Sequence, residues 1–142
     1  MSTIVVGVDG SEGAQQALEY ALDEAKLRAA RVRVVSAWHA PTMVYAGGYV
    51  VPLPSDQEWA HGAQQILDKA LEAANGAKAD VDVTTVVREG QPAEVLCEES
   101  KGADLLVVGS RGLGGFHELL VGSVSHQCAQ HAPCPVTIVP KA

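Results

Sequence analysis

Short apolar runs alternate with amphipathic segments along this chain, and this alternation limits the folds that it can adopt. The apolar runs are rich in β-branched residues, which is typical of strands that are covered on both faces of a parallel sheet. Between them, apolar residues recur every three or four positions, which predicts helices with one buried face. The predicted strands are Thr3 to Asp9, Val32 to Trp38, Val81 to Val87, Asp104 to Val108 and Pro135 to Val139.

The predicted helices begin at residues that favour helix starts. Ser11 can cap the first helix, and Ser55 or Asp56 begins a second one that ends near Asn75-Gly76. Pro92 suits the first turn of a third helix, which runs to about Ser100. A short fourth helix follows the glycine-rich stretch that ends at Ser125. The resulting order is strand and helix in regular alternation.

Short links between parallel strands require right-handed crossovers, so this order predicts an α/β fold with an open, doubly wound, five-stranded parallel sheet. We expect a Rossmann-like arrangement with strand order 3-2-1-4-5 and helices on both faces. With 142 residues, of which 47% are hydrophobic, residues 1–142 are expected to form a single domain. The alternating Val, Asp and Thr residues of the third strand place it nearer the edge of the sheet.

One segment, His39 to Pro54, shows neither the continuous apolar run of a buried strand nor the three-to-four-residue apolar spacing of a helix. It contains three prolines and a Gly-Gly pair. We predict a mobile loop or lid here, and the sequence does not indicate what this loop does when a ligand binds.

Ligands of doubly wound sheets bind beyond the carboxyl ends of the strands, where the winding reverses direction. With strand order 3-2-1-4-5, the reversal lies between the first and fourth strands. This places Asp9-Gly-Ser11 beside the glycine-rich stretch Gly109 to Ser125, although the two are far apart in sequence.

The glycines of that stretch have a defined spacing: Gly109, two residues, Gly112, nine residues, then Gly122-Ser123. The pattern is neither a Walker A motif nor a G-x-G-x-x-G motif after the first strand. Backbone N–H groups of residues 123–125 and the hydroxyls of Ser123 and Ser125 can converge on one phosphate at a helix start. An alternative remains open, in which the glycines only shape a turn and the serines only cap a helix.

Taken together, these motifs resemble the universal stress protein family in its ATP-binding form. The resemblance covers essentially all 142 residues, through IVVGVDGSEGA, VREGQPAEVL, DLLVVGSRGLGGFHELLVGSVS and CPVTIVP. The glycine spacing matches the ATP-binding signature of that family. The resemblance implies the fold of the adenine nucleotide alpha hydrolases and a homodimer. An apolar edge strand, Val136 to Val139, also favours dimerisation, because pairing with a second copy would cover it.

The resemblance also implies a set of binding residues. Phosphates and ribose would be held by Gly109, Gly112, Gly122, Ser123, Val124 and Ser125, and the adenine would be bordered by Gly7, Ala37 and Val87 or Val108. Asp9 would lie at the ribose and at any phosphate-bound Mg²⁺. The ligand is expected to be ATP, with ADP and AMP as alternatives, and the sequence does not decide between these and a cyclic nucleotide.

Two further residues complete the predicted site from their positions alone. Ser11 faces the same crevice at the start of the first helix, and Arg111 is the one cation inside the glycine motif. Arg111 can neutralise phosphate charge, or it can be an ordinary exposed loop arginine, and these alternatives remain open.

The leading functional interpretation is a nucleotide-dependent sensor or regulator of the stress response, with slow hydrolysis or none. No catalytic base, nucleophile or Walker lysine accompanies the glycine motif, whereas phosphoryl transfer needs positioned charge. Two alternatives remain open: a Mg²⁺-dependent ATPase or nucleotidyl-transferring enzyme that uses Asp9, and a partner-binding module with a vestigial nucleotide site.

Composition argues against several other functions. The net charge of -7 disfavours nucleic acid as a partner. The N-terminus, MSTIVVGVDGSEG, has no basic segment before its short apolar run, so we expect no signal peptide, no membrane association and a cytoplasmic location.

The cysteines and histidines carry weaker signals. An odd number of cysteines without C-x-x-C spacing disfavours disulfides and structural zinc. We expect Cys97 and Cys128 in the core and Cys134 as an exposed, oxidisable thiol. His126 and His131 are expected on the exposed side of the last helix, and Trp38 is expected either to pack or to cover the adenine.

Overall fold

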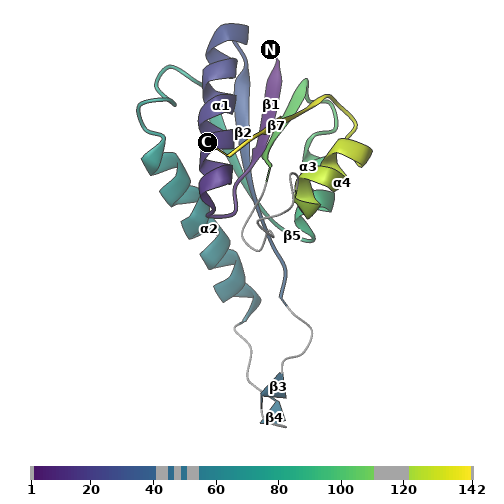
Figure 1. Cartoon of the computed structure of the whole chain (residues 1–142). Helices are drawn as coiled ribbons and strands as arrows, with labels where there is room; N and C mark the ends of the chain where they lie inside the picture. The colour runs from purple at the N-terminus through teal and green to yellow at the C-terminus, as the bar shows by residue number, and fades with distance from the viewer. Residues whose placement is uncertain (1, 41–44, 47–48, 51–54, 111–121, 142) are drawn as a thin grey trace.

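The computed structural model describes residues 2–40, 45–46, 49–50, 55–110 and 122–141. Its main feature is a five-stranded sheet in which every pairing is parallel (Figure 1). The strands of this sheet are β1 (Thr3–Gly7), β2 (Arg31–Trp38), β5 (Val83–Glu89), β6 (Leu105–Gly109) and β7 (Val136–Val139). Their spatial order is β5-β2-β1-β6-β7, which is 3-2-1-4-5 in chain order. The predicted fold class and strand order are therefore confirmed, as is the edge position of the third strand.

Helices cover both faces of the sheet. They are α1 (Glu12–Arg28), α2 (Asp56–Ala73), α3 (Pro92–Glu99) and α4 (Ser123–His131). Figure 1 shows α1 and α2 on one side and α3 and α4 on the other. We call these sides the first and second layers. Among the described residues, no helix has the length and apolar character that crossing a membrane requires.

The predicted helix starts are confirmed by their caps. The hydroxyl of Ser11 accepts the N–H of Ala14 at 3.2 Å, and Ser55 forms a capping box with Glu58 at the start of α2. Pro92 occupies the first turn of α3. Local side-chain chemistry therefore determines where these helices begin.

Alternate strand residues pack against opposite layers, which explains why the central runs are continuously apolar. Ile4 and Val6 of β1 belong to the core cluster beneath α1 and α2, whereas Val5 belongs to the cluster beneath α3 and α4. All three side chains are fully buried. The first layer packs closely because α1 presents alanines, Ala17 and Ala21 among them, to the sheet.

The third strand begins two residues later than predicted. Val81 donates its N–H to the carbonyl of Lys78 at 3.1 Å, and Asp80 has a φ of 66°. These features form a turn, so pairing with β2 starts only at Val83. The alternation of apolar residues therefore predicted a strand that begins two residues too early.

The predicted loop His39 to Pro54 contains a short antiparallel hairpin, so the expectation of a segment without regular structure was wrong for part of it. β3 (Tyr45–Ala46) pairs with β4 (Tyr49–Val50). A Gly-Gly pair between two β-favouring segments is a hairpin signal that could have been recognised. The other residues from 41 to 54 lie outside the described part of the chain.

We predict that Leu67→Ala lowers the free energy of unfolding by about 2–5 kcal/mol, measured by urea denaturation. Leu67 is 0% exposed between α2 and the sheet, so truncation leaves a cavity. Leu27→Ala is the matched control, because Leu27 is 83% exposed on α1 and should change stability by less than about 0.5 kcal/mol. Equal losses in both variants would contradict this description of the first layer.

Candidate functional site

The strand register aligns three residues from separate segments in one row at the carboxyl edge of the sheet. β1 is paired with β2 at Gly7 and Val35, and with β6 at Val6 and Val107. Continuing both registers beyond β1 brings Asp9 level with Ala37 and with Ser110. The N–H of Val8 donates to the carbonyl of Val35 at 2.9 Å, which closes the last pairing of the β1–β2 ladder, Gly7 with Val35. This edge is where the winding of the sheet reverses.

A tight turn holds Asp9 at this edge. Its Oδ1 accepts the N–H of Ser11 at 2.9 Å, and Gly10 has a φ of 87°, in the left-handed region that favours glycine. Ser11 in turn caps α1. Asp9 is partly exposed, so its carboxylate combines a turn-forming role with access to the crevice.

The start of α4 is tied to the same edge. Gly122, the N-cap residue, donates its N–H to the carbonyl of Ser110, and no side chain caps this helix. In an α-helix the N–H groups of the first turn have no acceptor within the helix. Those of Ser123, Val124 and Ser125 are therefore presented at the helix start, where the helix dipole also favours an anion.

The two serines of this turn differ in what their hydroxyls contact. Ser125 is buried, and its Oγ lies 3.0 Å from the carbonyl oxygen of Ser110 and 3.1 Å from that of Gly122. Ser123 is exposed. The hydroxyl of Ser125 thus holds the start of α4 against the end of β6, and that of Ser123 faces outward.

Two of the predicted site glycines have a clear packing role. A Cβ on Gly109 would lie 2.7 Å from the carbonyl oxygen of Gly13, in the first turn of α1. A Cβ on Gly7 would lie 2.8 Å from Cδ1 of Leu96, on α3. The sequence indicated a ligand role for both glycines, with a turn-forming role as the alternative for those of the motif, and this packing was not predicted. The sequence does contain a signal for this packing, namely Gly13 in the first turn of α1, where the absence of a side chain lets the helix backbone lie close to Gly109.

The residues predicted to border the adenine lie on different faces. Ala37 and Val108 pack into the second layer, whereas Val87 packs into the first. The structure therefore brings Val108, and not Val87, to the face that Ala37 occupies. Arg111 and Gly112 lie outside the described residues.

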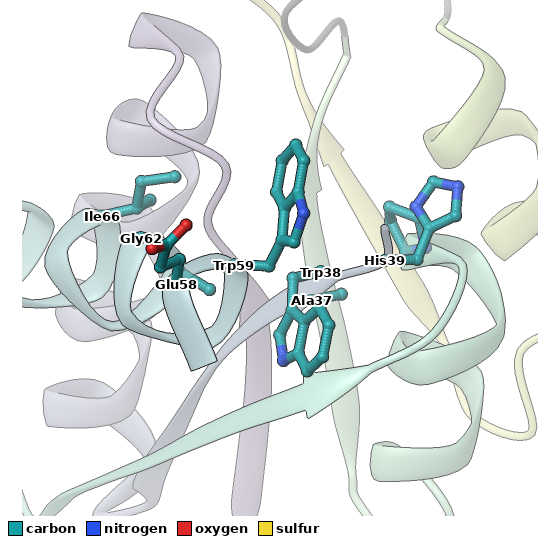
Figure 2. A pocket seen from close by; sticks show the side chains of 9 residues that line it. Ala37, Trp38, His39, Glu58, Trp59, Gly62 and Ile66 are labelled. Atoms are coloured by element: carbon teal, nitrogen blue, oxygen red, sulfur yellow. The ribbon is translucent and has the colours of Figure 1, made fainter. Parts of the chain in front are cut away.

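A cavity of about 540 Å³ lies between the end of β2 and the start of α2 (Figure 2). Ala37 and Trp38, which the sequence associated with the adenine, both lie in its wall. The lining residues are Ala37, Trp38, His39, Glu58, Trp59, Gly62, Ala63, Ile66 and Pro92. Helical periodicity assigns Trp59 to the apolar side of α2 but does not reveal that it lines a cavity, because periodicity does not distinguish core from cavity wall.

A second cavity, of about 570 Å³, lies between the start of α1 and α2. Gly10 and Ser11 line it on one side, and Ile66 and Lys69 line it on the other. Ile66 lines both cavities, so the two are adjacent.

The cysteines gather in the second layer. Cys128 is fully buried, and burial, together with the neighbouring Cys97, raises its pKa to about 12. Cys97 and Cys134 are both partly exposed, and burial is the main cause that raises the pKa of Cys134. The prediction of a core thiol is thus confirmed for Cys128 but not for Cys97.

Histidines of α4 face solvent, as expected: His126 and His131 are both exposed. Within the described ranges, no three His, Cys, Asp or Glu side chains gather in a way that could hold a metal ion.

Comparison with known proteins relates the whole chain to one family. Residues 1–140 match the family model described as the universal stress protein family. The chain is 36% identical to a universal stress protein of Mycolicibacterium smegmatis, over 96% of this chain and 45% of that protein. It is 34% identical to universal stress protein YxiE of Bacillus subtilis, over 96% of this chain and 97% of that protein. The chain therefore spans about half the length of some curated relatives and nearly all of another.

Solved structures give the same result. A universal stress protein in complex with cAMP is 28% identical, with a TM-score of 0.71 over 97% of this chain and 95% of that one. A universal stress protein of Archaeoglobus fulgidus in complex with dAMP is 25% identical, with a TM-score of 0.69 over 98% of both chains.

We predict that Gly109→Ala lowers the free energy of unfolding by about 1–3 kcal/mol in urea denaturation, because the added methyl group meets the backbone of α1. Gly76→Ala is the control. A Cβ at Gly76 meets nothing within 4 Å, so this variant should stay within about 0.5 kcal/mol of the parent. If Gly109→Ala were as stable as Gly76→Ala, the packing role of Gly109 would be refuted.

Proposed function

Because this chain belongs to the universal stress protein family, we propose that it binds an adenine nucleotide and acts as a nucleotide-dependent regulator of a stress response. One observation carries the proposal. The uncapped start of α4 is held at the carboxyl edge of the sheet by the hydrogen bond from Gly122 to Ser110, in the row that also contains Asp9. Related structures with bound cAMP and dAMP support an adenine nucleotide as the ligand class.

In this proposal, the first turn of α4 holds the phosphates. Three backbone N–H groups, from residues 123 to 125, donate to phosphate oxygens, and the exposed hydroxyl of Ser123 adds a fourth donor. Ser125 acts through the backbone, since its hydroxyl is bonded to carbonyls of Ser110 and Gly122. On the basis of the sequence, the proposed phosphate site also includes Gly109, Gly112 and Arg111.

Asp9 is proposed to contact the ribose and any Mg²⁺ that accompanies the phosphates. Carboxylate oxygen is a ligand type that Mg²⁺ prefers, and the turn at Gly10 keeps the side chain at the crevice. Bound Mg²⁺ would neutralise phosphate charge. ATP is the proposed ligand, with ADP and AMP as alternatives.

We propose slow hydrolysis or none, because no catalytic base, nucleophile or Walker lysine accompanies the glycine motif in the sequence, whereas phosphoryl transfer needs positioned charge. The alternative that the protein is an enzyme is tested by incubating the purified protein with Mg-ATP and measuring product formation. Formation of ADP or AMP from Mg-ATP at about one turnover per second or faster would place it among ordinary enzymes and refute a purely regulatory role.

The proposal includes a homodimer through β7. This edge strand pairs only with β6 in the described sheet, and all four of its residues are partly exposed. Three further parts of the proposal rest on the sequence. Residues 1–142 form one domain, the protein is located in the cytoplasm, and it binds neither nucleic acid nor membranes.

We predict that Ser123→Asp weakens ADP binding at least about tenfold in isothermal titration calorimetry, because its carboxylate would repel the phosphates. An acidic residue in the first turn of a helix favours the fold, so thermal stability should not fall. Gln130→Asp, on an exposed position in the last turn of α4, changes the net charge equally and should leave ADP binding unchanged. Unchanged ADP affinity in Ser123→Asp would refute phosphate binding at α4.

For the dimer, we predict that Ile138→Pro gives a monomer in sedimentation velocity, whereas the parent sediments as a dimer. Carbonyls of Pro135 and Val139 accept N–H groups from β6, so by the period of two the N–H of Ile138 points away from β6. Thr137→Pro is the contrasting control, because it removes an N–H that points toward β6 and should destabilise the fold. A monomeric parent protein at micromolar concentration would refute the dimer.

A further inference from the structure

Two cysteines from different helices meet in the second layer. Cys97 lies on α3 and Cys128 lies on α4, and these helices pack against each other (Figure 1). Cys128 belongs to the core cluster of this layer, and Cys97 packs against that cluster. The side chain of Cys97 is also a hydrogen-bond partner of the Cys128 thiol. Two thiols that are far apart in sequence are therefore in contact, and both are free.

The two thiols differ in their access to solvent. Cys97 is partly exposed, whereas Cys128 is 0% exposed, and burial is the main cause that raises the pKa of Cys128 to about 12. Cys128 therefore stays protonated at neutral pH and out of reach of a dissolved oxidant. An accessible cysteine beside a second thiol is the arrangement in which proteins form reversible disulfides, because the first thiol is oxidised and the second then displaces the oxygen from it.

The third cysteine has a different neighbour. Ser100, which follows α3, is a hydrogen-bond partner of the Cys134 thiol, and the Ser100 hydroxyl itself donates to the carbonyl of Cys97 at 3.1 Å. Cys134 thus contacts the end of α3 with a hydroxyl, and not a thiol, as its hydrogen-bond partner. An odd number of cysteines is compatible with one reversible pair, and Cys134 is the thiol left over.

A bond between Cys97 and Cys128 would act on the start of α4. Cys128 lies about one helical turn beyond Ser125, whose hydroxyl holds this helix start against Ser110. Thiols in hydrogen-bond contact must approach each other by roughly 1–2 Å to reach the S–S length of about 2.05 Å. Because the core around Cys128 is closely packed, this approach displaces α4 toward α3.

We propose that Cys97 and Cys128 form a reversible disulfide in response to hydrogen peroxide, and that this disulfide weakens nucleotide binding at the start of α4. The disulfide site itself goes beyond the proposed function, whereas its effect on the ligand rests on that function.

The reaction consumes one molecule of peroxide. The thiolate of Cys97 attacks one peroxide oxygen, so that the O–O bond breaks, a sulfenic acid forms on Cys97 and hydroxide leaves. Sγ of Cys128 then attacks Sγ of Cys97, the S–O bond breaks and the S–S bond forms. The protons of the two thiols leave with the two hydroxides as water. The two sulfurs have then lost two electrons to peroxide, and a dithiol reductant returns both.

The first test maps the bond in the full chain. We expect peroxide to lower the intact mass of the parent by the mass of two hydrogens, and dithiothreitol to reverse this change. Digestion without reductant should yield a linked pair of peptides that contain Cys97 and Cys128. Cys134→Ser is the matched control, because it removes one thiol and leaves the pair intact, whereas Cys97→Ser should show no loss of two hydrogens. A disulfide that includes Cys134, or oxygen added to Cys97 without any linkage, would overturn the assignment.

The second test measures the effect on the nucleotide by calorimetry. The Kd for ADP should rise at least about tenfold in the oxidised parent and in oxidised Cys134→Ser, because the displaced amides of α4 no longer match the phosphates. Cys97→Ser should bind ADP equally well before and after peroxide treatment. Equal Kd values for the oxidised and the reduced parent would overturn the effect on the ligand.

Failure of this inference is distinguishable from failure of the proposed function. If the reduced parent binds ADP and peroxide forms no bond between Cys97 and Cys128, the nucleotide site stands and the inference is overturned. If the bond forms but the reduced parent does not bind ADP, the proposed function is refuted together with the effect on the ligand, and the disulfide site stands.

Discussion

The parallel pairing of β1 between β2 and β6 is the constraint on which the candidate site depends. Hydrogen bonds in both ladders determine which residues of three distant segments are level with one another at the carboxyl edge. Extended beyond the last paired residues, these registers bring Asp9, Ala37 and Ser110 level with one another. A change of register by one residue would also exchange the residues that face the two layers.

A second constraint is the close packing of backbone at this edge. Gly109 lets the first turn of α1 approach the end of β6, and Ser110 accepts hydrogen bonds from Gly122 and Ser125 at the start of α4. Two helix starts from opposite layers are thereby positioned against the end of the same strand, β6. The same glycines and serines that resemble a ligand motif thus have structural duties, and these duties present the amides of α4 in a rigid arrangement suited to an anion.

Much of the fold could be predicted from the sequence, because the signals that specify it are local. Continuous apolar runs identified the buried strands, and Ser11, Ser55 and Pro92 marked helix starts through interactions within a few residues. Prediction was less accurate where a local pattern competes with a turn. Asp80 ends such a turn before β5, and the hairpin of β3 and β4 was missed although a Gly-Gly pair separates its strands.

The sequence by itself determined the order of the elements, the strand order and the glycine spacing of the candidate site, since periodicity, capping and crossover handedness depend on neighbouring residues. Only the tertiary structure decided that the hydroxyl of Ser125 is bonded to carbonyls, that Gly109 contacts Gly13, and that Trp59 lines a cavity beside Ala37. These facts depend on how helices from different parts of the chain are seated on the sheet. Side chains that meet in this way carry no common local pattern, because their contact is set by packing across the fold.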